Sequence, residues 1–367
     1  MAKLHGGMYP DKARPGSMRA YIDTPGGNRK WRRFKSEDEA ASWLIGQSAE
    51  INKGTFQEPS KITVGDWMEE WLDVYTKPKV RTNTYERYAI SFAHMEPLYA
   101  IPLQKLEPHA VQKFYSTSKL SQNALHKVHQ LLKAALRQAA NNNYIMRNPL
   151  DAVPAPKVKK TEITTFAAEE VCALLEFCKN RPPRHSARYY PLFCLLAMTG
   201  ARIGEILALK WEDVDLEKRT IFIKNSAEET KTYGARIGDV KTVKGKRKIS
   251  FPLSVLDAIK SLPHGEGLIF KTRTGNQLYK RNVIRAWEEL IAAYNRQKGV
   301  AHIKYRSLHK LRHTHATTLL ADGDIAIADV SARLGHARIS HTLDLYAHAR
   351  PEQDKKIADK IDGLYKK

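Results

Sequence analysis

Hydrophobic residues recur at two different spacings along this 367-residue chain, and the spacing changes from one region to the next. In residues 18–35 apolar and charged positions alternate on either side of a Pro-Gly-Gly turn, which is typical of a β-hairpin. The sequence Ser-Glu-Asp-Glu from Ser36 then caps a predicted helix. Residues 1–57 are therefore interpreted as a small separate module of sheet and helix.

From residue 63 to residue 140 the apolar positions follow helical spacing, with stripes of leucine and aromatic side chains. Four helices are predicted, the last of them over residues 121–140. Such stripes indicate a packed core. A segment rich in proline and lysine follows, so we interpret residues 58–160 as a helical domain that ends in a basic linker.

The third region, residues 161–350, is predicted to be mainly helical. Residues 190–199 are apolar enough for a buried helix, which Gly200 would end. Residues 220–224 and 248–252 alternate as strands of a small antiparallel sheet, and the stretch between them contains a long loop over residues 225–239.

Composition and charge narrow the functional classes. The chain has 61 Lys and Arg against 39 Asp and Glu, a formal net charge of +22, which indicates a polyanionic partner bound in a salt-dependent way. Three cysteines without a CxxC spacing favour reduced core residues in a cytosolic protein. No apolar run has membrane-spanning length, so no membrane partner is expected.

Residues with phosphodiester chemistry gather near the carboxyl end of the chain. His309 and Arg312 are three residues apart and would share one face of a helix. His336 directly follows Gly335, where a short helix is predicted to end. Arginine binds non-bridging phosphate oxygens in a fork, histidine exchanges a proton near neutral pH, and a tyrosine such as Tyr346 can act as a nucleophile.

A metal site is the competing interpretation of these histidines. His309, His313 and His315 could be ligands, but no HExxH sequence or cysteine pair accompanies them. Arg312 between them would repel a cation. We therefore expect neither a metal nor another cofactor.

At these residues the chain resembles the tyrosine recombinases of phage and transposon integrases. The resemblance rests on His309-Lys310-Leu311-Arg312, on Leu334-Gly335-His336, on Tyr346 and, upstream, on the Thr-Gly-Ala-Arg segment that contains Arg202. It implies a site-specific recombinase in which Tyr346 attacks DNA and forms a 3′-phosphotyrosyl intermediate. Arg202, Arg312 and His336 would stabilise the transition state, and His309 would be the base.

The same resemblance implies a catalytic lysine on a hairpin, for which Lys241 is our choice. Lys244, Lys231 and Lys224 compete, because the long preceding loop blurs the register. Glu205, three residues after Arg202, could orient the catalytic groups through a hydrogen bond or could be an ordinary surface residue.

The implied fold class is α+β and multidomain. It comprises a small β-sheet-plus-helix N-terminal domain that binds arm-type DNA sites (1–57), a four-helix core-binding domain (58–160), a mainly α catalytic domain with a small antiparallel sheet (161–350) and a C-terminal tail helix (351–367). The tail would pack on a neighbouring protomer of a tetramer, or be a frayed terminus.

Basic residues along these domains are the predicted DNA contacts, and a solvated surface is the alternative for each of them. They are Arg29, Lys30, Trp31, Arg32, Arg33 and Lys35 in the first domain, and Lys77, Lys79, Arg81, Lys119, Lys127, Lys133, Lys157, Lys159 and Lys160 in the second.

The implied partners are double-stranded DNA with core-type and arm-type sites, a homotetramer on that DNA, an excisionase and a host DNA-bending protein. The implied location is the cytoplasm, at the nucleoid of a bacterial host. Two other functions stay open. One is a Xer-like resolvase or a type IB topoisomerase with the same chemistry, and the other is an architectural DNA-binding protein that does not cleave.

Overall fold

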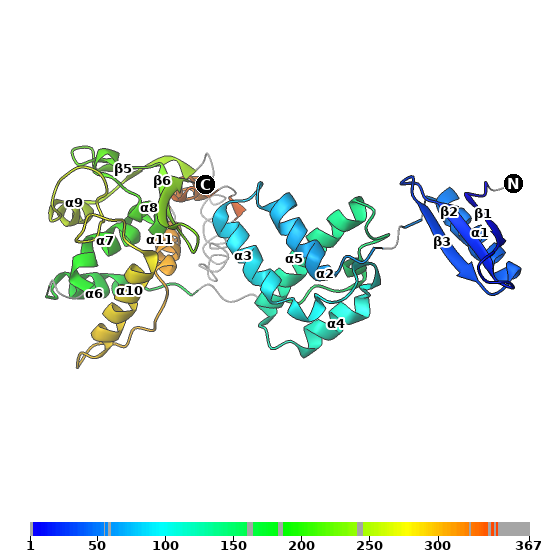
Figure 1. The fold of residues 1–367 in the computed structure, drawn as a ribbon. Helices are drawn as coiled ribbons and strands as arrows, with labels where there is room; N and C mark the ends of the chain where they lie inside the picture. The colour runs from blue at the N-terminus through cyan, green and yellow to red at the C-terminus, as the bar shows by residue number, and fades with distance from the viewer. Residues whose placement is uncertain are drawn as a thin grey trace, which may run out of the picture. The chain divides into compact units, whose positions relative to one another are not determined.

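The computed structural model describes residues 3–54, 56–57, 60–159, 164–182, 186–240, 245–322, 324–336, 339–340 and 343. The chain divides into two compact units, Met1–Lys159 and Lys160–Lys367, and each is described by itself. Both units combine helices with small antiparallel sheets, so the predicted α+β class is confirmed (Figure 1). None of the described helices is both long and apolar enough to cross a membrane.

The first unit opens with a three-stranded antiparallel sheet in the order β1-β2-β3. Its strands are β1 (Gly6–Pro10), β2 (Met18–Asp23) and β3 (Arg29–Phe34), and helix α1 (Glu37–Asn52) follows them. The Ser36 hydroxyl accepts a hydrogen bond from the backbone of Glu39 and caps α1, as its sequence predicts. Helix α1 packs against all three strands of this sheet.

The rest of the first unit is helical, as predicted. It contains α2 (Val64–Glu70), which continues as the π-helix η1 (Trp71–Thr76), then α3 (Thr82–Ala93), α4 (Pro108–Thr117) and α5 (Gln122–Asn141), with short 3₁₀ turns at Glu96–Leu98, Leu103–Lys105 and Pro149–Ala152. Trp67 is fully buried at the centre, and its indole N–H donates to the Ala135 carbonyl at 3.0 Å. The aromatic and leucine stripes thus form one core.

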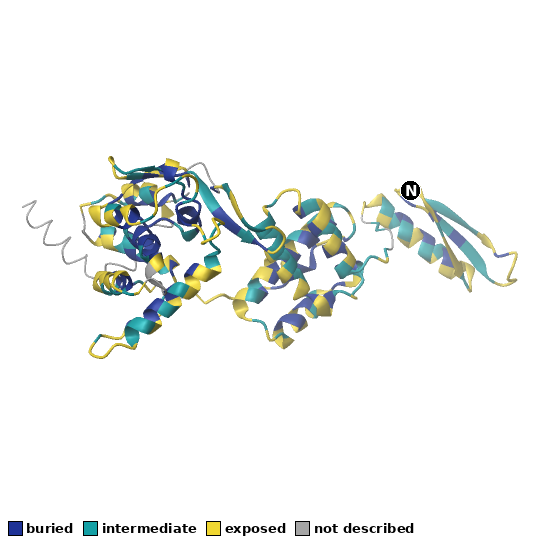
Figure 2. Cartoon of the chain, turned by 60° about the vertical axis from the view of Figure 1, so that its left-hand side comes forward, coloured by how far each residue is buried: buried dark blue, intermediate teal, exposed yellow. Residues whose placement is uncertain are grey.

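The second unit surrounds the apolar helix α7 (Tyr190–Thr199), whose side chains are almost all buried (Figure 2). Around it are α6 (Ala168–Lys179), α8 (Ile203–Leu207), α9 (Leu253–Lys260), α10 (Lys280–Asn295), α11 (His309–Asp322) and α12 (Ile327–Leu334), with 3₁₀ turns at Ser186–Tyr189 and Trp211–Asp213. One cluster of buried apolar side chains joins α6 to α11. It is the scaffold for the candidate site.

Two small sheets lie in this unit. The first has the order β4-β5-β8, from β4 (Val214–Asp215), β5 (Thr220–Ile223) and β8 (Arg247–Ser250), so the two predicted strands pair as expected. The loop predicted over residues 225–239 is wrong. Those residues form the hairpin of β6 (Asn225–Thr230) and β7 (Gly234–Asp239), and Gly234 with a φ of 66° permits its turn.

The packing of the β6–β7 hairpin explains why the sequence pattern did not predict it. Strand β6 packs on α8, and a Cβ atom on Gly204 would lie 2.6 Å from the Ser226 hydroxyl. The buried residues of β6 are Ala227, Glu228 and Thr230, so the strand shows no alternation of large apolar side chains. A second correction concerns Cys172, which is exposed on α6, whereas Cys178 and Cys194 are buried as predicted.

Candidate active site

Arg202 is positioned by the end of helix α7. Gly200 ends that helix in the left-handed conformation, with a φ of 64°, and a Cβ atom there would lie 2.6 Å from the His315 ring. Arg202 then takes the N-terminal capping position of α8, with its side chain 41% exposed. The turn at Gly200 is buried and requires a glycine, and it places Arg202 where its side chain is partly exposed to solvent.

Arg312 lies on α11 and is 3% exposed. Its guanidinium donates to the Gly200 carbonyl at 2.9 Å and to the Leu334 carbonyl at 2.7 Å. Both acceptors lie at the C-terminal ends of helices, α7 and α12, where unpaired carbonyls and the helix dipole attract a cation. Arg312 therefore fixes the two turns that lead to Arg202 and to His336.

Glu205 is 3% exposed, so its interpretation as an ordinary surface residue is excluded. Its carboxylate accepts from the backbone N–H and the guanidinium of Arg202, both at 2.8 Å. Burial by itself would raise the pKa of Glu205, but the hydrogen bonds and charge of Arg247, and then those of Arg202, lower it below its ordinary value. The ionised carboxylate holds the Arg202 side chain in one orientation.

Arg247 is a residue that the sequence analysis missed. It begins β8, is 9% exposed, and donates to Glu205 from both terminal nitrogens, at 2.9 and 3.3 Å. The signal was available in the sequence, since Arg247 occupies the same face of its strand as the buried Ile249. A cation at an inward-facing strand position requires a buried partner.

His309 is the first residue of α11, and as a whole residue it is exposed. It meets the ring of His313 edge to face, with centroids 4.8 Å apart. Desolvation, followed by the charges of Arg312, Arg202 and Lys310, lowers the pKa of His309 below its ordinary value. A neutral imidazole at physiological pH is suited to accept a proton.

His315 has a structural role. Its Nδ1 lies 3.1 Å from the Ala197 carbonyl, and its Nε2 accepts from Arg333 at 3.1 Å. The backbone acceptor requires a proton on Nδ1, so the ring is neutral, and burial lowers its pKa to about 4. Within the described ranges, no three His, Cys, Asp or Glu side chains are grouped in a way that could hold a metal ion.

The remaining catalytic predictions have different outcomes. Gly335 ends α12 with a φ of 67°, and His336 follows it, half-buried, with its backbone N–H donating to the Ser331 carbonyl at 3.1 Å. Tyr346 and Lys241 lie outside the described residues, as does the tail over residues 351–367. Their roles therefore stay predictions.

Two of the three lysines that compete with Lys241 for the role of catalytic lysine, Lys224 and Lys231, lie in the described residues. Lys224 is bound to Asp213 at 2.6 Å and to Glu212 at 3.2 Å, and these two hydrogen bonds raise its pKa. A lysine held this way is a poor proton donor to DNA. Lys231 lies in the turn between β6 and β7, and Lys244 is outside the described residues.

The charges around Glu205 do not balance. Arg202 and Arg247 both donate to Glu205, whereas the described hydrogen bonds of Arg312 go to the Gly200 and Leu334 carbonyls and those of Arg333 to backbone carbonyls and His315. Burial, and then the charge of Arg202, lowers the pKa of Arg312 to about 9. The cluster therefore carries excess positive charge that an anion such as a phosphate would neutralise.

The basic residues predicted for the N-terminal sheet divide between its two faces. Arg29, Trp31 and Arg33 alternate with Lys30 and Arg32, and the latter two share the face of the buried residues that contact α1. On the open face, Trp31 is 45% exposed beside Tyr9 and Tyr21. Arg29 pairs with Asp23 at 2.7 Å, and Arg33 pairs with Asp11.

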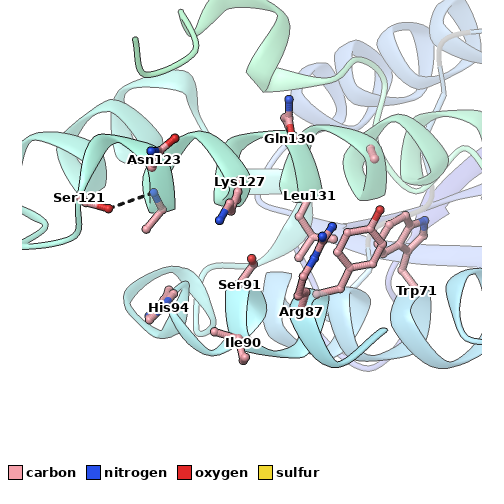
Figure 3. A pocket seen from close by; sticks show the side chains of 13 residues that line it. Trp71, Arg87, Ile90, Ser91, His94, Ser121, Asn123, Lys127, Gln130 and Leu131 are labelled. Carbon is pink, nitrogen blue, oxygen red and sulfur yellow. Dashed lines mark hydrogen bonds between the residues drawn. The ribbon is translucent and has the colours of Figure 1, made fainter. Parts of the chain in front are cut away.

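In the helical part of the first unit, Lys127 lines a cavity of about 400 Å³ between α3 and α5. Figure 3 shows Arg87 and His94 on the opposite helix, so three basic side chains share this cavity with Trp71 and Leu131. Arg87 and His94 are residues that the sequence analysis did not select. Their spacing along α3 places them on one face.

The other predicted contacts are less uniform. Lys77 lies 3.5 Å from Asp73, and Lys133 lies 3.0 Å from Asp151, so each has a carboxylate partner. Lys35, Lys79, Arg81, Lys119, Lys157 and Lys159 are described, while Lys160 lies outside the described residues. No phosphate contact is established for any of them.

The fold and the arginine cluster are typical of one class of protein, the enzymes that cleave and rejoin phosphodiester bonds in DNA. The chain belongs to the phage integrase family, whose model matches residues 164–353. The model of the phage integrase N-terminal SAM-like domain also matches, over residues 63–118. The protein is therefore a tyrosine recombinase, a site-specific enzyme of mobile elements that cleaves and rejoins DNA.

Individual relatives agree with this assignment. A XerC-like tyrosine recombinase of Caldanaerobacter subterraneus is 26% identical over 86% of this chain and 86% of its own length. The integrase of Staphylococcus phage L54a is 26% identical over 86% of this chain and 96% of its own.

Two solved structures share the fold. The Tn1549 transposon integrase, in complex with a circular intermediate DNA, has a TM-score of 0.71 and 21% identity and covers 82% of this chain and 99% of that one. A lambda integrase tetramer bound to a Holliday junction has a TM-score of 0.57 and 18% identity and covers 92% and 95%.

Proposed function

We propose that this recombinase integrates and excises a mobile element through a covalent 3′-phosphotyrosyl intermediate formed by Tyr346. The observation that carries the proposal is the under-compensated cluster of Arg202, Arg247 and Arg312 around one buried carboxylate. Guanidinium groups fixed before the substrate arrives stabilise developing phosphate charge without reorganisation.

In the proposed step, the phenol oxygen of Tyr346 forms a bond to the scissile phosphorus while the bond to the 5′-oxygen breaks. The phenol proton passes to His309, whose lowered pKa keeps the ring neutral and able to accept it. Lys241 gives a proton to the departing 5′-oxygen. Reversal with the 5′-hydroxyl of a partner strand rejoins the DNA.

The non-bridging oxygens would be held by Arg202 and Arg312, with His336 as a further donor. Glu205 would act by holding Arg202 rather than by touching the phosphate, since Arg202 donates to it at 2.8 Å. The energy of the phosphodiester is retained in the phosphotyrosyl bond. The reaction therefore needs neither a nucleotide nor a resident metal ion.

Domain roles are also proposals. Residues 1–57 would bind arm-type sites through the open face of the sheet, where Trp31 is exposed between basic residues. Residues 58–160 would hold the core site, with Arg87 and Lys127 at the cavity between α3 and α5. The formal charge of +22 supports both roles.

The partners follow by similarity. The lambda integrase to which this chain is similar forms a tetramer on a Holliday junction, and we propose a homotetramer here, with residues 351–367 packed on a neighbouring protomer. An excisionase and a host DNA-bending protein would direct excision. The enzyme would act at the nucleoid of a bacterial host.

A covalent trapping experiment tests the chemistry. The purified chain is incubated with a nicked duplex that carries the end sequence of the element encoding it, so that the cleaved 5′ strand diffuses away. We expect a protein–DNA adduct on the 3′ side with the native chain and none with Tyr346→Phe. Tyr305→Phe is the matched control and should still form the adduct, because Tyr305 bonds Glu288 on α10.

A Xer-like resolvase is the second candidate, favoured by the XerC-like relative. The N-terminal sheet domain separates the two functions. Deletion of residues 1–57 should abolish integration and arm-site binding in an integrase but should leave a resolvase nearly unaffected. The third candidate, an architectural DNA-binding protein, predicts no adduct at all in the trapping experiment.

A further inference from the structure

Arg247 bonds backbone carbonyls of the candidate site in addition to the Glu205 carboxylate. Besides its two bonds to Glu205, its Nε donates to the Arg333 carbonyl at 2.6 Å, and Nη1 donates to the Gly245 carbonyl at 3.0 Å. Its side chain is 7% exposed and that of Glu205 is 3% exposed. Every nitrogen of this guanidinium is thus engaged with a fixed protein acceptor.

The strand position of Arg247 places it beside the hairpin of β6 and β7. Arg247 pairs with Ile223, the last residue of β5, and Asp239, the last residue of β7, pairs with Asn225, the first residue of β6. Because Ile223 and Asn225 are two positions apart in the chain, the start of β8 lies near the end of β7. The bond from Arg247 to the Gly245 carbonyl fixes the backbone just before β8.

The other contacts reach the remaining parts of the site. Through Glu205, Arg247 is connected to the Arg202 side chain, because the same carboxylate accepts from both arginines. Through the Arg333 carbonyl it is connected to the last turn of α12, directly before Gly335 and His336.

We propose that Arg247 is a positioning residue for strand cleavage, which holds Arg202 and the turn before His336 in one arrangement. This inference rests on the proposed function. Arg247 would not touch the phosphate itself, since its donors are already used inside the protein. Its effect would appear in the rate of cleavage at saturating DNA and not in the affinity for DNA.

A nearby ion pair provides the matched control. Arg181 pairs with Glu289 at 2.8 Å and its side chain is 12% exposed, so it is another arginine–carboxylate pair of the same unit. Its described partners are Glu289 on α10 and the ring of Phe177 on α6. Loss of Arg181 should therefore test the general effect of removing a half-buried ion pair.

The variants are Arg247→Lys, Arg247→Met and Arg181→Met, together with a double variant, Glu205→Gln and Arg247→Met. The double variant is needed because Arg247→Met leaves Glu205 as a buried, partly unpaired carboxylate and can unfold the protein. Circular dichroism and thermal unfolding identify the variants that remain folded. Each folded variant is then assayed for core-site binding and for single-turnover cleavage of the nicked duplex.

We expect cleavage by Arg247→Met and by the double variant to be slower by about 100-fold at saturating DNA, with the dissociation constant changed less than about threefold. Arg247→Lys should recover part of the rate, because a lysine keeps the charge but loses the forked geometry. Arg181→Met should cleave like the native chain.

A second readout distinguishes positioning from general damage. A duplex with a methylphosphonate at the scissile position lacks the negative oxygen that Arg202 would bind, so the orientation of Arg202 should matter less. We expect the rate defect of Arg247→Met to shrink by at least about tenfold on this substrate. A merely destabilised protein would show the same defect on both substrates.

The outcomes separate this inference from the proposed function. If the native chain forms no covalent adduct, the proposed function fails and the role of Arg247 fails with it. If the native chain forms the adduct and the folded Arg247 variants cleave at its rate, the role of Arg247 alone is overturned. A parallel loss of DNA binding and cleavage, or an equal defect in Arg181→Met, would also overturn it.

Discussion

Single residues in this site are tuned by burial and by neighbouring cations. Burial opposes ionisation of both Glu205 and Arg312, yet the carboxylate stays ionised because two arginines donate to it. For His309, burial is the largest cause that disfavours a positive imidazole, and the charges of Arg312 and Arg202 add to it. Burial and neighbouring arginines thus act together on these groups.

The protonation of His309 predicts how cleavage depends on pH. Because the pKa of His309 lies below its ordinary value of 6.5, the ring is mostly neutral at pH 6.5. We expect the single-turnover rate to fall as pH decreases, along a limb centred below pH 6.5. Rates measured between about pH 5 and pH 8 would show this limb.

Lys310 provides a control for that profile, since its charge contributes to the lowered pKa of His309. Lys310→Gln should move the limb toward higher pH. A limb centred at or above pH 6.5 in the native chain would contradict the assignment of His309 as the base.

Glu205 predicts a pH dependence of stability. Its pKa is lower in the folded chain than its ordinary value of 4.5, so its stabilising contribution is present above that value and is lost as pH falls through the folded pKa. We expect Glu205→Gln to reduce the free energy of unfolding by about 3 kcal/mol near neutral pH. The difference should shrink progressively below pH 4.5 in urea unfolding experiments, whereas a constant difference at all pH values would exclude this linkage.

At the scale of elements, helix ends rather than helix faces build the site. The helices α7 and α12 both end at a left-handed glycine, and both expose a carbonyl to Arg312. The helix α11 packs against α7 and α12, which brings Arg312 between these ends (Figure 1). Three elements are therefore connected by one buried guanidinium.

Gly200 should be intolerant of any side chain. A Cβ atom would be strained at a φ of 64° and would lie 2.6 Å from His315 and 2.8 Å from Leu334. We expect Gly200→Ala to destabilise the protein by about 3 kcal/mol, from backbone strain and overpacking together. Denaturant unfolding measures the change.

Gly275 is the matched control. It also has a positive φ, 83°, but no atom lies within 4 Å of the position of its Cβ. Gly275→Ala should therefore cost only about 1 kcal/mol, from strain alone. Equal effects at both positions would show that the contacts of Gly200 are unimportant.

Two basic residues that line the cavity between α3 and α5, Arg87 and Lys127, are predicted to contribute to core-site binding (Figure 3). Replacing Arg87 and Lys127 by glutamine should weaken core-site binding and reduce the slope of log affinity against log salt by about 2. Lys133→Gln on the same α5 should have little effect, because Lys133 is already paired with Asp151 at 3.0 Å. A similar loss in both variants would indicate nonspecific charge rather than this cavity.

At the scale of the whole molecule, the excess of 61 basic over 39 acidic residues dominates. This charge is distributed over both units, each of which contains more basic than acidic residues. Binding to DNA should therefore release counterions from many phosphates at once.

Affinity for DNA should accordingly fall steeply with salt. For an enzyme that contacts about 6–10 phosphates, we expect a decrease of about 10³-fold or more between about 50 mM and 200 mM salt. Titration of a labelled core-site duplex at several salt concentrations measures the slope. An affinity that hardly changes with salt would exclude phosphate contacts as the main source of binding.

The sequence by itself determined the α+β class, the hairpin of β2 and β3, the helical stripes of residues 63–140 and the strands around residues 220 and 250. These patterns are local, because burial of one face imposes a period of two or 3.6 residues. It also led to the prediction of Arg202, His309, Arg312 and His336 as site residues, and Arg202 and His336 each follow a helix-ending glycine.

Only the tertiary structure decided which partners these residues meet. The hairpin of β6 and β7 was missed because the buried residues of β6, which packs on α8, are small or polar and do not alternate with exposed ones. The strand pattern marks Arg247 as inward-facing, but its partner Glu205 is 42 positions away in the chain, and a hydrogen bond across such a separation leaves no periodic signal. The sequence determines which ionisable side chains are present. The charge balance around Glu205 depends on the packing of segments that are distant in the chain.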